Sequence, residues 1–193
     1  MLITNSHLQG TPVLSVQAGE PIGYLDAAII DPDSLKIIAF RVHGAPDRST
    51  DILDVQSIRE YSNLGVVIDD IDELVGHDDV IRIKNVLDLN FSLLNLKVET
   101  KKGSKLGHVI DFTVTPDDFI VQQLIVKRPV VKSFLDSELT IPRTEIVEIT
   151  DYKVIVKDEE KTIKERAEKE DFVPNFVNPF RKTDYVSAEN SEN

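Results

Sequence analysis

The chain has 193 residues, of which 41% are hydrophobic, so its length and composition allow one large or two small packed domains. Its net charge of -12 disfavours broad electrostatic binding to nucleic acid, because an acidic surface repels phosphate backbones. The absence of cysteine excludes disulfides and thiolate metal sites, and no apolar run approaches the roughly 20 residues that span a bilayer.

Residues 1–76 are predicted to form a first unit of short strands. The first ten residues lack the basic start and the apolar core of a signal peptide, so we expect a cytoplasmic protein. Glycine, proline and aspartate separate the apolar runs, which predicts strands at 13–17, 23–30, 35–42 and 64–68 and one helical turn at 54–59. Many short strands with close turns favour a closed or nearly closed barrel, since closure leaves no strand edge unpaired.

Residues 77–93 are predicted to be a helical linker. The run 69–79 before it is acidic, and apolar residues then recur at helical spacing. We expect the apolar side chains of the linker to pack between the first unit and the one that follows. These side chains are Val80, Ile83, Val86, Leu87, Phe91, Leu93 and Leu94.

Residues 94–157 repeat the first unit. Residues 19–42 align with residues 103–126 without a gap, at a shift of 84, and a chain that carries one pattern twice is built from two copies of one unit. The shift becomes 88 farther on, which places an insertion in a surface loop between residues 127 and 140. The matching turn residues are Gly19, Gly23, Pro32 and Asp33 in the first copy and Gly103, Gly107, Pro116 and Asp117 in the second.

This inserted loop is unusually apolar. It contains Val130, Val131, Phe134 and Leu135. One interpretation is that these side chains pack on the other unit or on the linker helix. The alternative is that they form a docking surface for a partner protein.

Residues 158–193 differ in composition from the rest of the chain. Residues 157–169 are highly charged and carry Glu–Lys pairs four residues apart, which predicts a solvated helix. In the polar segment that follows, Phe172, Phe176 and Phe180 recur every four residues, and two prolines there prevent a regular helix. This segment is predicted to be extended, either as a short recognition motif for a partner or as a strap across its own chain.

No arrangement of residues indicates catalysis, a cofactor or a metal. The four histidines are far apart in the sequence, and the acidic run 69–79 lacks the ligand order and closing glutamate of a calcium loop. Residues 103–107 resemble a phosphate-binding loop only superficially, because a strand rather than a helix follows them. We therefore expect a protein that is not an enzyme and has no cofactor.

The second unit has a different charge from the first. Residues 1–75 carry 4 basic and 12 acidic side chains, whereas residues 96–157 carry 10 and 9. A basic cluster at strand ends of the second unit is a candidate site for ribosomal RNA or an acidic protein. It could equally be a solvated face, or it could dock on the acidic first unit. Its members are Lys101, Lys102, Lys105, Lys127 and Arg128, with His108 beside them.

The repeated pattern resembles the PRC-barrel family over about residues 13–70 and 94–157. In the second copy, Gly107 and Asp111 fit the family's Gly-x-Val-x-Asp motif, and a turn with proline and aspartate follows. In the first copy Ala27 stands at the position of the motif aspartate, and Asp26 is displaced by one. The family includes the cytoplasmic part of the photosynthetic reaction-centre H subunit and a ribosome maturation factor.

The resemblance implies an all-β protein with two tandem small PRC-type barrels. They are joined by a short helical linker and followed by a C-terminal helix and an extended tail. The family carries no catalytic residues, so it implies a non-catalytic adaptor that binds another protein. The alternative is a ribosome-associated maturation factor that binds RNA or a ribosomal protein through its second barrel.

Overall fold

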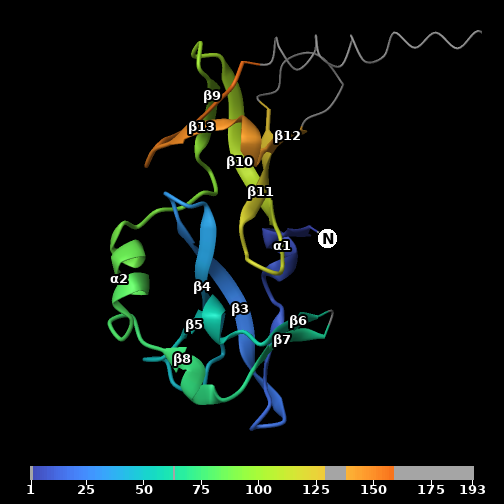
Figure 1. Cartoon of the computed structure of the whole chain (residues 1–193), viewed down its shortest axis with the longest axis vertical. Coiled ribbons are helices and arrows are strands. Elements are labelled where there is room, and N and C mark those ends of the chain that lie inside the picture. The colour runs from blue at the N-terminus through green and yellow to red at the C-terminus, as the bar shows by residue number, and fades with distance from the viewer. Residues whose placement is uncertain (1, 63, 129–137, 159–193) are drawn as a thin grey trace, which may run out of the picture. The chain divides into compact units, whose positions relative to one another are not determined.

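The computed structural model describes residues 2–62, 64–128 and 138–158, all of which belong to one compact unit (Figure 1). These residues are mostly β-structure and form two sheets, so the predicted all-β class is confirmed at this level. No helix in the described ranges is long and apolar enough to cross a membrane.

The first sheet contains seven strands in the order β6-β7-β2-β3-β4-β5-β8. Its pairs are antiparallel except β2 and β7, which are parallel. Its strands are β2 (Pro12–Ser15), β3 (Glu20–Asp31), β4 (Lys36–His43), β5 (Ile52–Asp54), β6 (Glu60–Ser62), β7 (Gly65–Ile68) and β8 (Leu74–Val75).

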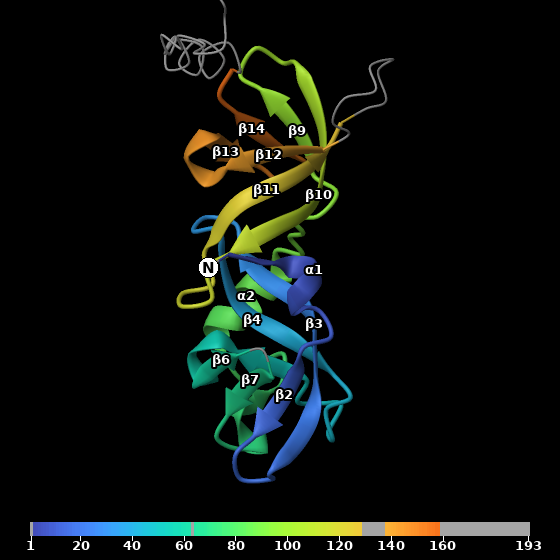
Figure 2. The same cartoon turned by 90° about the vertical axis from the view of Figure 1, so that its right-hand side faces the viewer.

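The second sheet has the order β12-β11-β10-β9-β14-β13 (Figure 2). A further strand, β1, pairs with β10. Here β9 and β14 are the parallel pair. Its strands are β1 (Ile3–Thr4), β9 (Lys97–Thr100), β10 (Lys105–Val114), β11 (Val121–Lys127), β12 (Glu138–Pro142), β13 (Ile146–Ile149) and β14 (Lys153–Val156).

The two sheets share one strand order. Read from β5, the first sheet runs β5-β4-β3-β2-β7-β6, and the second runs β12-β11-β10-β9-β14-β13, with corresponding strands in corresponding places. The short 3-10 turns also correspond: η1 (Val55–Ser57) follows β5 as η3 (Arg143–Glu145) follows β12. The sequence repeat is therefore a repeat of topology. A third 3-10 turn, η2 (Ile71–Glu73), precedes β8.

The closed barrel favoured by the sequence is not observed. Within the described ranges, no hydrogen-bonded pair joins the first and last strands of either sheet. In the first sheet, the edge of β5 that a closing strand would need pairs with β8 instead. The chain turns the corner from β5 to β6 through η1, so these two strands are joined by a turn and not by a ladder.

Gly23 and Gly107 occupy equivalent positions where two strands approach closely. A Cβ atom on Gly107 would overlap the carbonyl oxygen of Lys127 on β11, and the φ of Gly107 is +143°. On Gly23 it would lie 2.9 Å from the carbonyl oxygen of His43, which is 84 residues before Lys127. Both halves therefore need glycine here for the same backbone contact.

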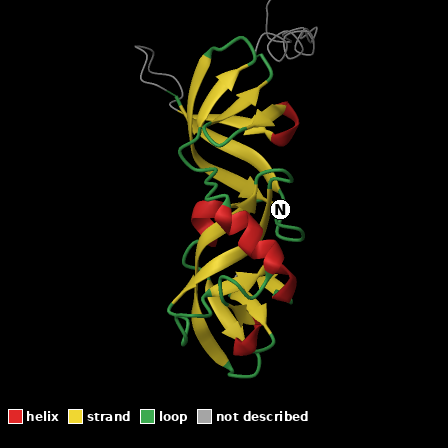
Figure 3. Ribbon diagram, turned by 90° about the vertical axis from the view of Figure 1, so that its left-hand side faces the viewer, coloured by secondary structure: helices red, strands yellow, loops and turns green. Residues whose placement is uncertain are grey.

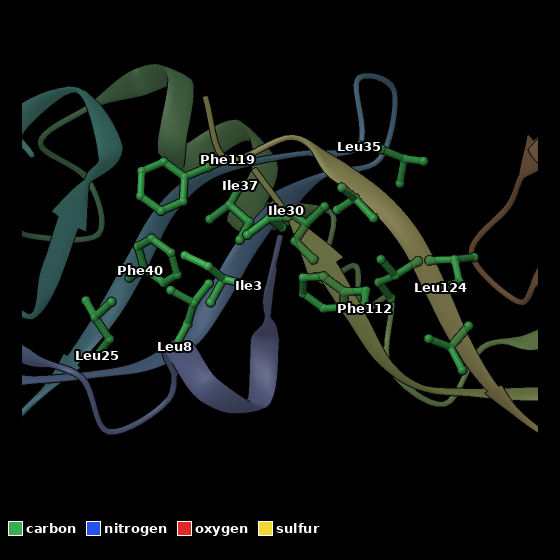
Figure 4. Close-up of a cluster of buried hydrophobic side chains, with 14 of the residues drawn as sticks. Ile3, Leu8, Leu25, Ile30, Leu35, Ile37, Phe40, Phe112, Phe119 and Leu124 are labelled. Carbon is green, nitrogen blue, oxygen red and sulfur yellow. The ribbon is translucent and has the colours of Figure 1, made fainter. Parts of the chain in front are cut away.

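Both sheets contribute to one continuous hydrophobic cluster (Figure 4). The rings of Phe40 on β4 and Phe119 before β11 meet edge to face, with centroids 5.6 Å apart and planes at 75°. Ile30 and Ile37 from the first sheet and Phe112 from the second lie in the same cluster. Burial of these side chains stabilises the contact between the two halves as well as each half.

Two hairpin turns form the junction between the halves by exchanging backbone hydrogen bonds. The amide of Ile37 donates to the carbonyl of Phe119 at 3.0 Å, and the amide of Val121 donates to the carbonyl of Leu35 at 2.9 Å. Each of these bonds is the image of the other at the shift of 84. Leu35 and Phe119 also share an unusual left-handed backbone, with φ of 50° and 55°.

The junction turn of the second half is held by Asp118. Its carboxylate accepts hydrogen bonds from the Thr115 hydroxyl and from the Ile120 amide, the latter at 3.1 Å. The hydrogen bond from Thr115, with help from the charge of Lys36, lowers the pKa of Asp118 below its usual value of 3.8. The ionised carboxylate therefore stabilises this turn.

We expect Asp118→Asn to lower the melting temperature at pH 7 but not in acid. Because the pKa is lowered by folding, the contribution is present above the ordinary pKa and is lost as the pH falls through the folded pKa. Melting curves from pH 7 to pH 2.5 should show a difference from the wild type that shrinks below about pH 4. Asp117→Asn is the control, because no hydrogen bond from a described residue reaches its carboxylate. An unchanged difference at pH 2.5 would contradict this role.

The segments that precede β2 and β9 correspond at a shift of 85. The amide of Gly10 donates to the carbonyl of Leu25 at 2.7 Å, as the amide of Asn95 donates to that of Val109 at 2.8 Å. The first segment, with β1 and the short helix α1 (Asn5–Leu8), lies on β10 of the second sheet. Ser6 of α1 donates from its hydroxyl to Asp111 at 2.6 Å.

The predicted linker helix is α2 (Ile81–Asp88), which lies across the first sheet (Figure 3). Ile83 of α2 packs with Ile29, Ala39 and Ile52 in a second, smaller cluster. Arg82 forms an ion pair with Asp54. The expectation that the whole linker packs between the units is therefore wrong for α2, which covers a face of the first sheet. Only the segment after α2, with Phe91, Leu93 and Leu94, joins the shared cluster.

Candidate functional site

A row of three lysine side chains and one histidine crosses the second sheet. Lys127 on β11 stands opposite His108 on β10, His108 opposite Lys97 on β9, and Lys97 opposite Lys153 on β14. Residues directly opposite each other project to the same face of a sheet, with strands about 4.8 Å apart. We call these four residues the cationic row.

The cationic row lies on the outer face of the sheet. Lys97, His108 and Lys127 are exposed, and Lys153 is half-buried. The neighbouring residues in each strand point the other way and are fully buried: Val98, Val109, Val126 and Val154. The alternation of polar and apolar residues that builds the core therefore also aligns the cations.

Two acidic side chains lie beside the row. Glu99 is on β9, two residues after Lys97, and its Oε2 atom lies 3.2 Å from the Nζ atom of Lys153. Glu138 on β12 stands opposite Lys127 at one end of the row. Within the described ranges no salt bridge reaches Lys97 or Lys127, so neither of these lysine charges is directly neutralised.

The basic residues named from the sequence lie beside this row, where β10 begins and β11 ends. Lys105 is on β10, opposite Glu99. Lys101 and Lys102 form the turn between β9 and β10, where their amides donate to Val156 and Asp158. Arg128 follows Lys127 directly at the end of β11. The structure thus gathers these residues at the same end of the β10–β11 pair.

Two members of the cationic row, Lys97 and Lys153, were missed by the sequence reasoning. They are 56 residues apart in the chain and become neighbours only because β9 and β14 pair in parallel. His108 was noted, but its neighbours on both sides depend on strand register. The available signal was that a valine follows each lysine in a predicted strand, Val98 after Lys97 and Val154 after Lys153, which favours an outward-facing lysine beside an inward-facing valine.

The apolar residues proposed for docking lie outside the described residues. They are Val130, Val131, Phe134, Leu135, Phe172, Phe176 and Phe180. They remain predictions from the sequence.

The turn residues of the repeat have structural roles in their turns. Gly19 and Gly103 have φ of 70° and 83°, which glycine adopts without strain. Pro32 and Asp33 are in the turn after β3, as Pro116 and Asp117 are in the turn after β10. The amide of Asp33 donates to Asp31 Oδ1 at 3.2 Å, which is ordinary turn chemistry.

In the part of the chain that the structure describes, no three histidine, aspartate or glutamate side chains are arranged to hold a metal ion. No known family model matches the chain, and no curated protein matches it significantly.

Proposed function

We propose that the protein is a non-catalytic adaptor that uses its cationic row to bind an acidic surface of another protein. The observation that carries this proposal is the alignment of Lys127, His108, Lys97 and Lys153 across four adjacent strands. A rigid sheet fixes the spacing of these charges before a partner arrives. Complementary charges on a rigid face give orientation and fast association.

The surroundings of the row favour an acidic protein over RNA. Glu138 stands opposite Lys127 at one end of the row, and Glu99 on β9 forms an ion pair with Lys153. A nucleic-acid backbone that extends beyond the row would meet these carboxylates and a chain with a net charge of -12. A compact cluster of aspartate and glutamate on a partner would need to reach only Lys97 and Lys127, which have no salt bridge to a described residue.

The adaptor role also agrees with the proposed family. We propose that the halves are two PRC-type units, on the strength of the repeated glycine and Asp-Pro motifs and of the strand order they share. The segments after residue 158, which the sequence predicts to be a charged helix and an extended tail, and the apolar loop complete the proposal as further docking segments. A cytoplasmic location is part of the same proposal.

We expect charge reversal in the row to weaken binding to acidic ligands. The probe is a fluorescein-labelled decapeptide of alternating glutamate and glycine, and the measurement is fluorescence anisotropy at 50 mM and 300 mM salt. Lys97→Glu with Lys127→Glu should weaken binding about tenfold or more, because each exposed pair contributes up to about 1 kcal/mol and reversal adds repulsion. Binding by the wild type should weaken at 300 mM salt.

Arg48→Glu is the matched control, because Arg48 is exposed in a loop of the first half. It should leave binding unchanged. Equal binding by the double variant and the wild type would refute the proposal. Tighter binding of a single-stranded RNA decamer than of the peptide, lost in the same double variant, would instead support the ribosome-associated alternative.

A further inference from the structure

A cavity of about 320 Å³ lies against one edge of β3 in the first half. Residues 27–30 of β3 line one side, and the segment after α2 and the helix α1 line others. Strand β2 pairs with β3 only as far as Tyr24, so residues 27–30 have no strand partner on the side away from β4 among the described residues. The cavity is therefore bordered by an open strand edge.

The second half shows what such an edge binds. The equivalent part of β10 pairs with β1, with Ile3 opposite Val114 and Thr4 opposite Thr113. At the shift of 84, Val114 and Thr113 correspond to Ile30 and Ile29, which line the cavity. The first half thus leaves open the edge that a two-residue antiparallel strand fills in the second.

The charged side chains at the end of this strand edge differ between the two halves. In the second half Asp111 accepts hydrogen bonds from the amide and hydroxyl of Ser6, at 3.3 and 2.6 Å. The equivalent residue in the first half is Ala27, and both Ala27 and Arg41 line the cavity. The residue equivalent to Arg41 in the second half is Ile125. The first half thus has no carboxylate at position 27 and has a guanidinium nearby, which is paired with Asp51 through one nitrogen.

Most of the hydrogen-bond donors of Arg41 have no partner among the described residues. Its Nη1 atom lies 3.4 Å from Asp51 Oδ2, a long contact that uses one of its five donors. It stands on β4 beside the bulge at residues 26–27 of β3. A guanidinium in this position can bind a carboxylate with two parallel hydrogen bonds.

The side chain of Asn5 lies at the wall of the cavity. Asn5 is only 4% exposed and lines the cavity, and its side chain makes no hydrogen bond to any residue that the structure describes. No fully buried side-chain nitrogen or oxygen lacks a hydrogen-bond partner among the described residues, so the amide of Asn5 is open to the cavity and can hydrogen-bond to a ligand there. Asn90, which is equivalent to Asn5 at the shift of 85, lines the same cavity.

We propose that this cavity binds the C-terminal end of a peptide, which adds to β3 as an antiparallel strand and places its free carboxylate on Arg41. The direction follows from β1, which runs antiparallel to β10 towards Asp111. A peptide in the same orientation on β3 ends beside Ala27 and Arg41. Main-chain hydrogen bonds to β3 supply affinity, and the carboxylate selects a chain end over an internal segment.

The test uses a pool of biotinylated pentapeptides with the last three positions randomised, made both as free acids and as C-terminal amides. The full-length protein is passed over each pool, and binding is measured by biolayer interferometry. We expect the free-acid pool to bind at least about tenfold better than the amide pool, because a charge-assisted hydrogen bond is lost with the carboxylate. N-methylation of the backbone amides in the pool should also reduce binding.

Three variants make the test specific. Arg41→Ala and Ala27→Asp, which restores the residue found in the second half, should each remove the preference for the free acid. Arg48→Ala should keep it, and melting curves should show that all three variants fold. Equal binding of acid and amide pools, no binding of either, or an unchanged preference in Arg41→Ala would each overturn the proposal. The variant Lys97→Glu with Lys127→Glu should bind the free-acid pool as the wild type does. The proposal for this cavity and the proposal for the cationic row can therefore be refuted independently.

Discussion

Replacing Gly107 with alanine is expected to destabilise the protein by at least about 3 kcal/mol, because two costs add at this position. The new Cβ would overlap the carbonyl oxygen of Lys127 and lie 2.8 Å from its carbonyl carbon. The φ of +143° is also one that alanine rarely adopts. Denaturant unfolding followed by circular dichroism would measure the loss.

Gly103→Ala is the matched control for this prediction. Gly103 has a positive φ of +83°, but a Cβ there would meet no atom within 4 Å. Its cost should be limited to the left-handed backbone, about 1 kcal/mol. If both variants lost the same stability, the close contact between β10 and β11 would have no energetic role.

Phe40→Ala is expected to destabilise both halves at once, by about 3 to 5 kcal/mol. Phe40 is 1% exposed, and its ring contacts Phe119 of the other half. Removal of the ring leaves a cavity in the core that the two sheets share. Hydrogen exchange of backbone amides should therefore become faster in β10 and β11 as well as in β3 and β4.

Leu64→Ala serves as the control for the core substitution, since Leu64 is 78% exposed. It should change stability by no more than about 0.5 kcal/mol. Phe40→Ala would count against a shared core if exchange became faster in the first sheet alone.

The elements of each half could largely be predicted from local sequence. Glycine, proline and aspartate around residues 19–34 and 103–118 mark turns because they adopt or stabilise turn conformations. The helical spacing of Val80, Ile83 and Val86 predicted α2 to within a few residues. The gapless repeat correctly indicated that the two halves share one arrangement of strands.

The contacts between distant segments could not be predicted in this way. Strand β1 has two residues and pairs with β10 more than a hundred residues later, and no local pattern encodes such a pairing. Pairing between β9 and β14, which completes the cationic row, likewise depends on register. The open first sheet also depends on a contact between distant segments. Its outer strand β8 pairs with β5 and comes after all the other strands of that sheet in the chain.

The reciprocal bonds between Ile37 and Phe119 and between Val121 and Leu35 have a consequence for how the halves stay together. A contact in which each side offers the same groups is the kind that joins identical subunits around a two-fold axis. In a pair of separate subunits, such a contact would come apart on dilution. Here one polypeptide carries both sides, so association is intramolecular and independent of protein concentration. Within one polypeptide the two copies also need not be identical: the second has Asp111 where the first has Ala27, and the first has Arg41 where the second has Ile125.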